Sequence, residues 1–398
     1  MLSVSGRAVG VCLVVFFCGN LLQGQPPETI RVATFNCSPN RDMSGELLQD
    51  LKGGSNSQAR KVAAILRLVR PQIVLLNEFD FDESGDSLRV FLKEYVAVDA
   101  EWMTGPPLEY PFSFVASVNT GIPSGRDIDH NGKSADPADA IGFGRFPGQY
   151  GMVVLSQFPI DPQKVRTFQR LLWKAMPNAA LPEDPSEPNA MWYSDEDLNQ
   201  LRLSSKSHWD VPIQVGSQTI HVLASHPTPP AFDGPEDRNG RRDHDEIRMW
   251  AEYISEGPAE WLKDDQGAAG RLQPSASFVI LGDLNADPAD GASYNSAIHQ
   301  LLHHPRVNGT ATPRSEGAAA AAKKQQGVNL QHQGDPAHDT ADFSDRAVGN
   351  LRVDYVLPSR DLTVHATGVF WPTAGPETEL ITCSDHRLVW LDIAFATP

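Results

Sequence analysis

The feature that most constrains this chain is a series of short apolar runs, each of which leads into polar residues. In FVILGDLNADP (278–288), four apolar residues precede a glycine, and Asp283 and Asn285 follow two positions apart. TIRVATFN (29–36) and QIVLLNEFD (72–80) repeat this arrangement. Because these runs are short for helices and are bounded by turn-forming and polar residues, they predict buried β-strands.

Helical patterns alternate with these runs. In SQARKVAAILRLVRP (57–71), the apolar residues share one face of a helix, and the final proline ends it. HWDVPIQVGSQTIHVLASHP (208–227) predicts a hairpin that turns at Gly216–Ser217. Further helices are expected in the middle of 242–262 and over 293–302. Alternating strands, helices and hairpins predict an α/β protein with a mixed sheet.

The start of the chain has the features of an export signal. Arg7 followed by the apolar run VGVCLVVFFCG (9–19) predicts a signal peptide over residues 1–24, and hence a secreted or periplasmic protein. An uncleaved membrane anchor is the alternative. No later run is long and apolar enough to span a bilayer, so we expect no stable membrane span once the signal is removed.

Residues 25–398 are expected to form one domain, since no linker divides them and 40% of the chain is hydrophobic. Three long loop insertions are expected within it. They cover about 123–150, 177–197 and 309–345, which are rich in Gly, Pro, Asp or small polar residues. We expect the last insertion to be an irregular, partly mobile surface segment.

The net charge of −17 bears on the choice of partner. Sequence-independent binding to nucleic acid usually requires a basic surface that displaces counterions. An acidic chain fits better with a protein that meets a phosphate group through a metal ion.

Six predicted strands bring a carboxylate, amide or imidazole to one end or carry it within. Burying such groups unpaired is costly, so each needs a proton, a cation or a hydrogen-bond partner. Convergence around one metal ion and one phosphate group would satisfy them together. The residues are Asn36, Glu78, His226, Asp283, Asn285, Asp354, Asp385 and His386.

Their chemistry suits phosphoester hydrolysis. Hard cations such as Mg²⁺, with Mn²⁺ as the alternative, prefer oxygen ligands. Hydrolysis also requires an activated water, and donors that neutralise the phosphoryl oxygens and the leaving oxygen. An imidazole whose second nitrogen is held by a carboxylate is fixed in orientation and tautomer.

The segments TFN, NE, SHP, GDLNADP, RVDYVL and SDH, in this order, resemble the endonuclease/exonuclease/phosphatase superfamily, which includes deoxyribonuclease I, exonuclease III, neutral sphingomyelinases and inositol polyphosphate 5-phosphatases. The resemblance covers roughly residues 31–395, and GDLN with a later SDH is its most specific part. It implies a four-layer α/β sandwich, in which two packed mixed β-sheets are flanked by helices and carry the site at one edge.

The resemblance also implies individual roles. Glu78 would be the principal metal ligand, with Asn36 and Asp385 nearby. Asp283 would orient or deprotonate the attacking water, and Asn285 would donate to the phosphate.

Three further roles follow from the same resemblance. His386, paired with Asp354, would stabilise the phosphoryl oxygens. His226 would protonate the leaving oxygen or bind the phosphate. Taken singly, each of these residues also fits a turn, a strand cap or a satisfied buried acid.

Residues beside this set suggest additional sites. Asp127, Asp129 and Asn131 match the first half of a calcium loop, so a structural Ca²⁺ and a solvated polar turn are both open. Arg238, Arg241 and Arg242 follow the SHP segment and are candidates either for contacts to a substrate phosphate or for a salt-bridged helix start.

Two cysteines, Cys37 and Cys383, remain after removal of the signal peptide. Export permits a disulfide, and each lies close in sequence to a residue of the implied metal site. A disulfide and two buried free thiols are the two interpretations.

The sequence therefore predicts an exported, divalent-metal-dependent phosphoesterase that hydrolyses phosphate mono- or diesters by direct attack of water. A small-molecule or lipid-linked phosphoester is favoured over nucleic acid as the substrate. The alternatives are a secreted deoxyribonuclease I-like endonuclease and, from another class, a non-catalytic binding protein on the same scaffold.

Overall fold

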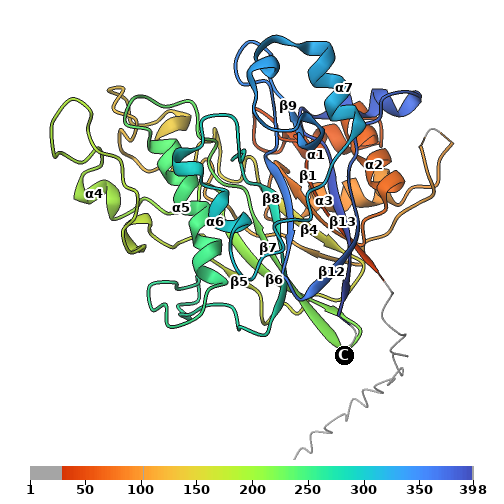
Figure 1. Ribbon diagram of the computed structural model, residues 1–398, viewed down its shortest axis with the longest axis horizontal. Coiled ribbons are helices and arrows are strands. Elements are labelled where there is room, and N and C mark those ends of the chain that lie inside the picture. The colour runs from red at the N-terminus through yellow and green to blue at the C-terminus, as the bar shows by residue number, and fades with distance from the viewer. Residues whose placement is uncertain (1–28, 102, 397–398) are drawn as a thin grey trace, which may run out of the picture.

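Two β-sheets packed face to face form the centre of the computed structural model, which describes residues 29–101 and 103–396 (Figure 1). The predicted signal peptide over residues 1–24 lies outside the described residues. The six-stranded sheet has the order β12-β13-β1-β2-β4-β3, and the five-stranded sheet has the order β11-β8-β7-β6-β5. Each sheet combines one parallel strand pair with antiparallel pairs, so both are mixed, as predicted.

The strands of the six-stranded sheet come from both ends of the chain. They are β1 (Ile30–Asn36), β2 (Ile73–Asn77), β3 (Phe112–Phe114), β4 (Met152–Ser156), β12 (Leu362–Val369) and β13 (Val389–Phe395).

The five-stranded sheet comes mainly from the middle of the chain. Its strands are β5 (Arg166–Thr167), β6 (His208–Val215), β7 (Gln218–Ser225), β8 (Ser277–Asp283) and β11 (Asp354–Pro358). The predicted hairpin is confirmed, because β6 and β7 pair up to the turn at Gly216–Ser217. A separate two-stranded sheet joins β9 (Ala341–Asp342) to β10 (Asn350–Leu351).

Helices cover the outer face of each sheet. The outer side of the six-stranded sheet packs against α1 (Glu46–Leu51), α2 (Ser57–Val69) and α3 (Asp86–Phe91). The outer side of the five-stranded sheet packs against α5 (Arg238–Tyr253) and α6 (His299–Leu302). Figure 1 shows these groups on opposite sides of the sheets, which confirms the predicted four-layer α/β sandwich.

Short helical segments occupy the connections. They are η1 (Leu92–Val96), η2 (Pro137–Asp139), η3 (Trp173–Ala175), α4 (Asp195–Leu198), η4 (Tyr294–Ser296), α7 (Glu316–Gln325), η5 (Gly327–Gln331), η6 (Pro336–His338) and η7 (Pro376–Cys383).

Both faces of strand β8 are buried, which explains its uninterrupted apolar sequence. Val279 and Leu281 point into the core between the sheets, whereas Phe278 and Ile280 point to the helical layer that contains α5. Successive strand side chains alternate between faces, so an uninterrupted apolar run is what a strand in the middle of a four-layer protein requires.

Two local expectations are wrong. The alanine-rich part of the 309–345 insertion forms helix α7. The Ser315 hydroxyl caps its first turn, and Ala318 is buried against the core between the two sheets. The predicted helix over 293–302 is instead split into η4 and α6, because Asn295 takes a left-handed conformation between them.

The strand directions bring distant residues to one edge. Asn36 ends β1 beside Asn77, which ends the parallel strand β2. In the other sheet, Asp354 opens β11 directly opposite Asp283, the last residue of β8. The described part of the chain contains no helix whose length and apolar character would let it cross a membrane.

Candidate metal-dependent active site

Asn36 joins the two sheets at the centre of the candidate site. It is fully buried, and its Nδ2 donates to Oε1 of Glu78 at 2.9 Å and to Oδ2 of Asp283 at 3.0 Å. Glu78 follows β2, and Asp283 ends β8 in the opposite sheet. One amide group therefore holds two carboxylates from different sheets close together.

Glu78 sits in a left-handed backbone conformation (φ 64°), which is uncommon for a residue with a side chain. Its Oε2 accepts hydrogen bonds from Asn40 at 2.6 Å and from Ser38 at 3.4 Å. The carboxylate is half-buried and surrounded by donors from the segment that follows β1. These contacts fix its position at the strand edge.

Asp283 is the most connected carboxylate of the site. Its Oδ1 accepts from the backbone of Asn285 at 3.0 Å, and its Oδ2 lies 3.4 Å from Nε2 of His226 and 3.6 Å from Nε2 of His386. Burial alone would raise the pKa of Asp283, but the charge of His386 and the bond from His226 outweigh it and lower the pKa. Asp283 is therefore ionised at neutral pH.

His386 is held from its other side by Asp354. Its Nδ1 lies 2.9 Å from Oδ2 of Asp354, and the Thr340 hydroxyl donates to that same oxygen at 2.9 Å. Burial opposes charging of His386, yet the carboxylates of Asp354 and Asp283 outweigh it and raise the pKa of His386. The imidazole is thus held as a cation between two acids.

His226 behaves differently from His386. Burial, together with the nearby charge of Lys206, lowers the pKa of His226, so its neutral form is favoured. Its Nδ1 is buried and has no hydrogen-bond partner. The backbone oxygen of the next residue, Pro227, accepts from Nδ2 of Asn285 at 3.1 Å. The predicted catalytic residues His226, Asp283, Asn285, Asp354 and His386 are therefore brought together.

The donor set fits a hard divalent cation. Glu78 and Asp283 offer carboxylate oxygens on either side of the Asn36 amide, which also carries an oxygen. Asp283, Asp354 and His386 each offer one possible ligand atom, and these lie within 4.8 Å of one another. Oδ1 of Asp354 is buried without a partner. The contacts of His386 with Asp354 and Asp283 explain why these three residues lie together, so this group does not require a metal.

Asp385 does not join this group. Its side chain is exposed and forms no hydrogen bond or ion pair among residues 29–101 and 103–396, although its charge adds to the raised pKa of His386. The structure therefore gives no support to its predicted role as a metal ligand. The segment before β13 turns His386 inward, and its neighbour consequently faces outward.

Each of the three arginines of the 238–242 segment contacts other groups of the protein. Arg238 forms an ion pair with Glu236, and the Arg241 guanidinium lies over the Tyr294 ring at 4.8 Å. Arg242 donates to four backbone oxygens, those of Ile141, Arg202, Leu203 and Ser204. Arg238 and Arg242 therefore have partners within the protein, whereas Nε of Arg241 is buried without a hydrogen-bond partner.

Cys37 and Cys383 are both buried and free, so of the two interpretations the structure agrees with two buried thiols. The two segments nevertheless lie side by side, because Nε2 of Gln58 donates to the backbone oxygens of Ser38 at 2.8 Å and Cys383 at 3.0 Å. Burial, together with the other thiol's charge, raises the pKa of Cys37. Both sulfurs belong to the apolar layer beneath α2.

The acidic loop at residues 127–139 brings three carboxylates close together, as a calcium site would require. Asp127, Asp129 and Asp139 each offer an oxygen within 4.8 Å of the others. Asn131 instead donates its amide to Asp129 at 3.0 Å and to Asp136 at 2.8 Å. Asp139 is therefore the third carboxylate of this group, and Asn131 meets the group through its amide donors.

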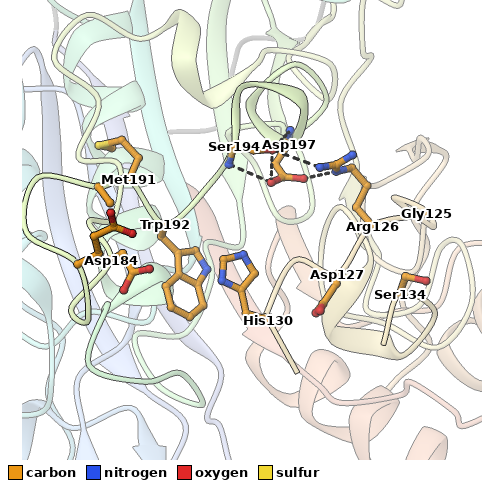
Figure 2. Close-up of a pocket in the computed structure, with 12 residues that line it drawn as sticks. Gly125, Arg126, Asp127, His130, Ser134, Asp184, Met191, Trp192, Ser194 and Asp197 are labelled. Carbon is orange, nitrogen blue, oxygen red and sulfur yellow. Dashed lines mark hydrogen bonds and ion pairs between the residues drawn. The ribbon is translucent and has the colours of Figure 1, made fainter. Parts of the chain in front are cut away.

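A shallow cavity of about 530 Å³ lies beside this loop (Figure 2). The 123–150 and 177–197 insertions form it, with the rings of His130 and Trp192 stacked at 4.2 Å and the Arg126–Asp197 ion pair in its wall. None of the catalytic candidates lines it. It is a feature of the loops, separate from the strand edge.

The structure adds residues that the sequence had not indicated. Thr340 orients Asp354, Asn40 binds Glu78, and Lys206 lies buried beside Pro227. Thr340 and Lys206 stand in segments without an apolar periodic pattern, so only their spatial neighbours reveal them. Asn40 lies four residues after Asn36, just beyond the polar end of a predicted strand. Its position near a strand end was the one indication in the sequence that it could belong to the site.

Comparisons with known proteins identify the family and the fold. A model of the "Endonuclease/Exonuclease/phosphatase family" matches residues 33–386. An endonuclease/exonuclease/phosphatase structure from Beutenbergia cavernae is 18% identical, with a TM-score of 0.51 over 93% of this chain and 72% of that chain. No curated protein matches the chain.

Two further structures have lower TM-scores. A family protein from Leptotrichia buccalis is 13% identical (TM-score 0.45, 92% of this chain and 100% of that chain). The human Nocturnin catalytic domain with bound sulfate is also 13% identical (0.42, 93% and 95%). On the family match, which spans most of its length, this chain belongs to the endonuclease/exonuclease/phosphatase family, whose members are metal-dependent hydrolases of phosphoester bonds.

Proposed function

We propose that this protein is an exported, Mg²⁺-dependent phosphoesterase that hydrolyses phosphate mono- or diesters by direct attack of water. The observation that carries the proposal is the bridge from Asn36 to Glu78 and Asp283, together with the approach of His226 and His386 to the same Oδ2 atom of Asp283. The bridge brings the oxygens of Glu78 and Asp283 close to two imidazoles, which supports a cation site beside a water-activating acid.

The cation site would be formed by Glu78, with the oxygens of Asn36 and Asp283 beside it. Carboxylate and amide oxygens suit Mg²⁺, and Mn²⁺ would be accepted by the same ligands. When bound, such a cation neutralises charge on the phosphoryl oxygens and lowers the pKa of water. Glu78 is only half-buried, so a cation has a route to it.

The remaining residues divide the work of hydrolysis. Ionised Asp283 orients the attacking water and accepts its proton. The His386 cation, held by Asp354, stabilises charge that develops on the phosphoryl group. Neutral His226 donates a hydrogen bond to a phosphate or leaving oxygen, and Asn285 donates to the phosphate. No covalent phospho-enzyme is required.

A small-molecule or lipid-linked phosphoester is our proposed substrate. The net charge of −17 disfavours the long-range attraction that nucleases use toward a polyanion. A secreted deoxyribonuclease I-like endonuclease is the second candidate, because the site chemistry is the same for a phosphodiester in DNA. A non-catalytic binding protein is disfavoured, since competent residues fill the group around Asp283.

Two subsidiary proposals concern location and a second ion. Export rests on the apolar run at residues 9–19 and its polar flanks, which are typical of a signal peptide. A structural Ca²⁺ in the 127–139 loop rests on the spacing of Asp127, Asp129 and Asp139 and on their oxygen chemistry.

The proposed function is tested with p-nitrophenyl phosphate, bis-p-nitrophenyl phosphate and plasmid DNA, each with Mg²⁺, Mn²⁺ or Ca²⁺. We expect turnover of a small ester that EDTA abolishes and that Glu78→Gln reduces at least 100-fold, roughly the loss seen when a catalytic group is removed. Glu256→Gln, at an exposed glutamate, is the matched control and should retain activity.

Each other outcome has a defined meaning. Preferential cleavage of plasmid DNA at low salt would favour the nuclease. The absence of turnover with every metal and every substrate would favour the binding protein.

A further inference from the structure

We propose that Lys206 is a phosphate-binding residue of this site, where its ammonium group meets an anionic phosphoryl oxygen of the substrate. The inference rests on the proposed function and extends it, since no motif in the sequence indicates a lysine here. Lys206 lies two residues before β6, the strand that forms a hairpin with β7 and so runs beside the segment of His226.

The ammonium group of Lys206 has unused donors. The residue is 7% exposed, and the one hydrogen bond of its Nζ goes to the backbone oxygen of Pro227 at 3.3 Å. A lysine carries three N–H donors. Across residues 29–101 and 103–396, no carboxylate lies within 4.0 Å of this nitrogen.

A buried cation without an ion-pair partner is costly, and an anionic ligand would remove that cost. Burial lowers the pKa of Lys206, while the charges of Glu246, Glu78 and Asp283 act to raise it. The last two are the carboxylates of the proposed centre. The lysine therefore lies within electrostatic reach of that centre.

Lys206 and Asn285 share an acceptor. Both Nζ of Lys206 and Nδ2 of Asn285 donate to the oxygen of Pro227, at 3.3 and 3.1 Å. Asn285 is the residue expected to donate to the phosphate. The shared acceptor therefore sets a cation beside the amide that binds the substrate, on the side of the site that His226 occupies.

Glu246 on α5 holds this arrangement in place, and its charge acts on Lys206 without a direct ion pair between the two among the described residues. Its Oε1 accepts from the backbone of Ser205 at 2.7 Å, and its Oε2 accepts from the backbone of Thr228 at 2.7 Å. The carboxylate thus ties the neighbour of Lys206 to the segment after His226. Lys206 is positioned by these contacts with its remaining N–H groups free for a ligand.

The experiment measures the affinity for inorganic phosphate by calorimetry in the presence of Mg²⁺, together with kcat and KM for p-nitrophenyl phosphate. In Lys206→Met we expect phosphate to bind roughly 10- to 100-fold more weakly, as for the loss of one charge-assisted hydrogen bond. We expect kcat/KM to fall by a similar factor. Lys61→Met, at an ion-paired lysine of α2, should leave both unchanged.

Lys206→Gln separates binding from a purely structural role. Glutamine can still donate to the Pro227 oxygen but carries no charge. We expect it to lose phosphate affinity as Lys206→Met does, and we expect Lys206→Arg to retain most of it. If Lys206→Gln binds phosphate as the wild type does, the lysine only holds the loop and the inference is overturned.

The inference and the proposed function fail in different ways. Calorimetry does not depend on turnover, so phosphate affinity that depends on Lys206 would support the inference even in an inactive protein. Conversely, EDTA-sensitive turnover with unchanged phosphate affinity in both neutral variants would leave the function intact and remove Lys206 from it.

Discussion

Nδ1 of His386 lies 2.9 Å from Oδ2 of Asp354, and its Nε2 lies 3.6 Å from Oδ2 of Asp283. The imidazole therefore stands between two acids that oppose each other across the β8–β11 ladder. The shorter contact fixes the ring and its tautomer, and the longer one leaves Nε2 free to meet a phosphoryl oxygen.

Asp354→Asn tests this division of roles. The amide cannot stabilise the imidazolium as a carboxylate does, so the pKa of His386 should fall and kcat should drop roughly 10- to 100-fold. NMR titration of His386 and steady-state kinetics would report the two effects. Asp392→Asn, which breaks the Arg31–Asp392 pair elsewhere in the sandwich, is the control for loss of a partly buried acid. Unchanged activity in Asp354→Asn would contradict the assigned role.

Gly282→Ala tests how closely β8 approaches β7. A Cβ at this position would lie 2.1 Å from the backbone oxygen of Ser225, so the two strands would have to separate. We expect a loss of about 1–3 kcal/mol in the free energy of unfolding. Because Asp283 is the next residue, activity should fall more than stability implies.

A matched glycine provides the comparison. A Cβ on Gly257 would meet open space, although its φ of +90° strains any side chain. Gly257→Ala should therefore cost only about 1 kcal/mol and leave kcat unchanged. Equal effects of the two substitutions, measured by urea unfolding and kinetics, would argue against the close approach.

Asp339 should make stability depend on pH. Burial, followed by the charges of Asp287, Asp290 and Asp335, raises the pKa of Asp339 to about 8. The folded state therefore holds a proton that the unfolded state releases near pH 4, so this group's contribution to stability falls as pH rises from about 4 to 8.

Asp339→Asn removes that penalty. In metal-free buffer we expect little change at pH 4 and a gain of roughly 1–3 kcal/mol at pH 8–9, measured by urea unfolding at each pH. Asp99→Asn, at an exposed aspartate, should show no such pH-dependent gain. A stability difference for Asp339→Asn that does not grow with pH would contradict the raised pKa.

The thiols give a prediction about oxidation state. Because Cys37 and Cys383 are buried and burial raises the pKa of each, a thiol reagent should react slowly with the folded protein. In a chain that begins at residue 25, two thiols should react after unfolding without reductant. Finding none would mean that the pair is oxidised.

The sequence predicted which residues meet at the edge of the sheets better than it predicted the structure and contacts of the loops. Asn36, Glu78 and Asp283 were predicted together because strand ends of opposite sheets meet in this architecture, and local apolar patterning reports strand ends directly. The role of Asp385 was implied by the resemblance of the SDH segment, which also contains His386. Adjacent residues point in different directions, however, and only three-dimensional contacts decide which one turns inward.

The loops required information that periodicity does not contain. Arg242 was a candidate for a substrate contact because it follows the SHP segment, but its guanidinium donates to four backbone oxygens. The alanine-rich run of α7 has a weak apolar pattern and forms a helix because Ser315 caps it and Ala318 packs on the core. Tertiary contacts overrode the local signal in both places.

The bridge through Asn36 has a consequence for evolution and engineering. Its two acceptors, Glu78 and Asp283, belong to different sheets. The distance between the two carboxylates, and with it the rate of hydrolysis, therefore depends on how the sheets pack against each other. A substitution such as Leu281→Ala, deep in their shared interior, would then alter turnover without touching any reacting group. The packing of the apolar core between the sheets therefore helps to set the geometry of the site.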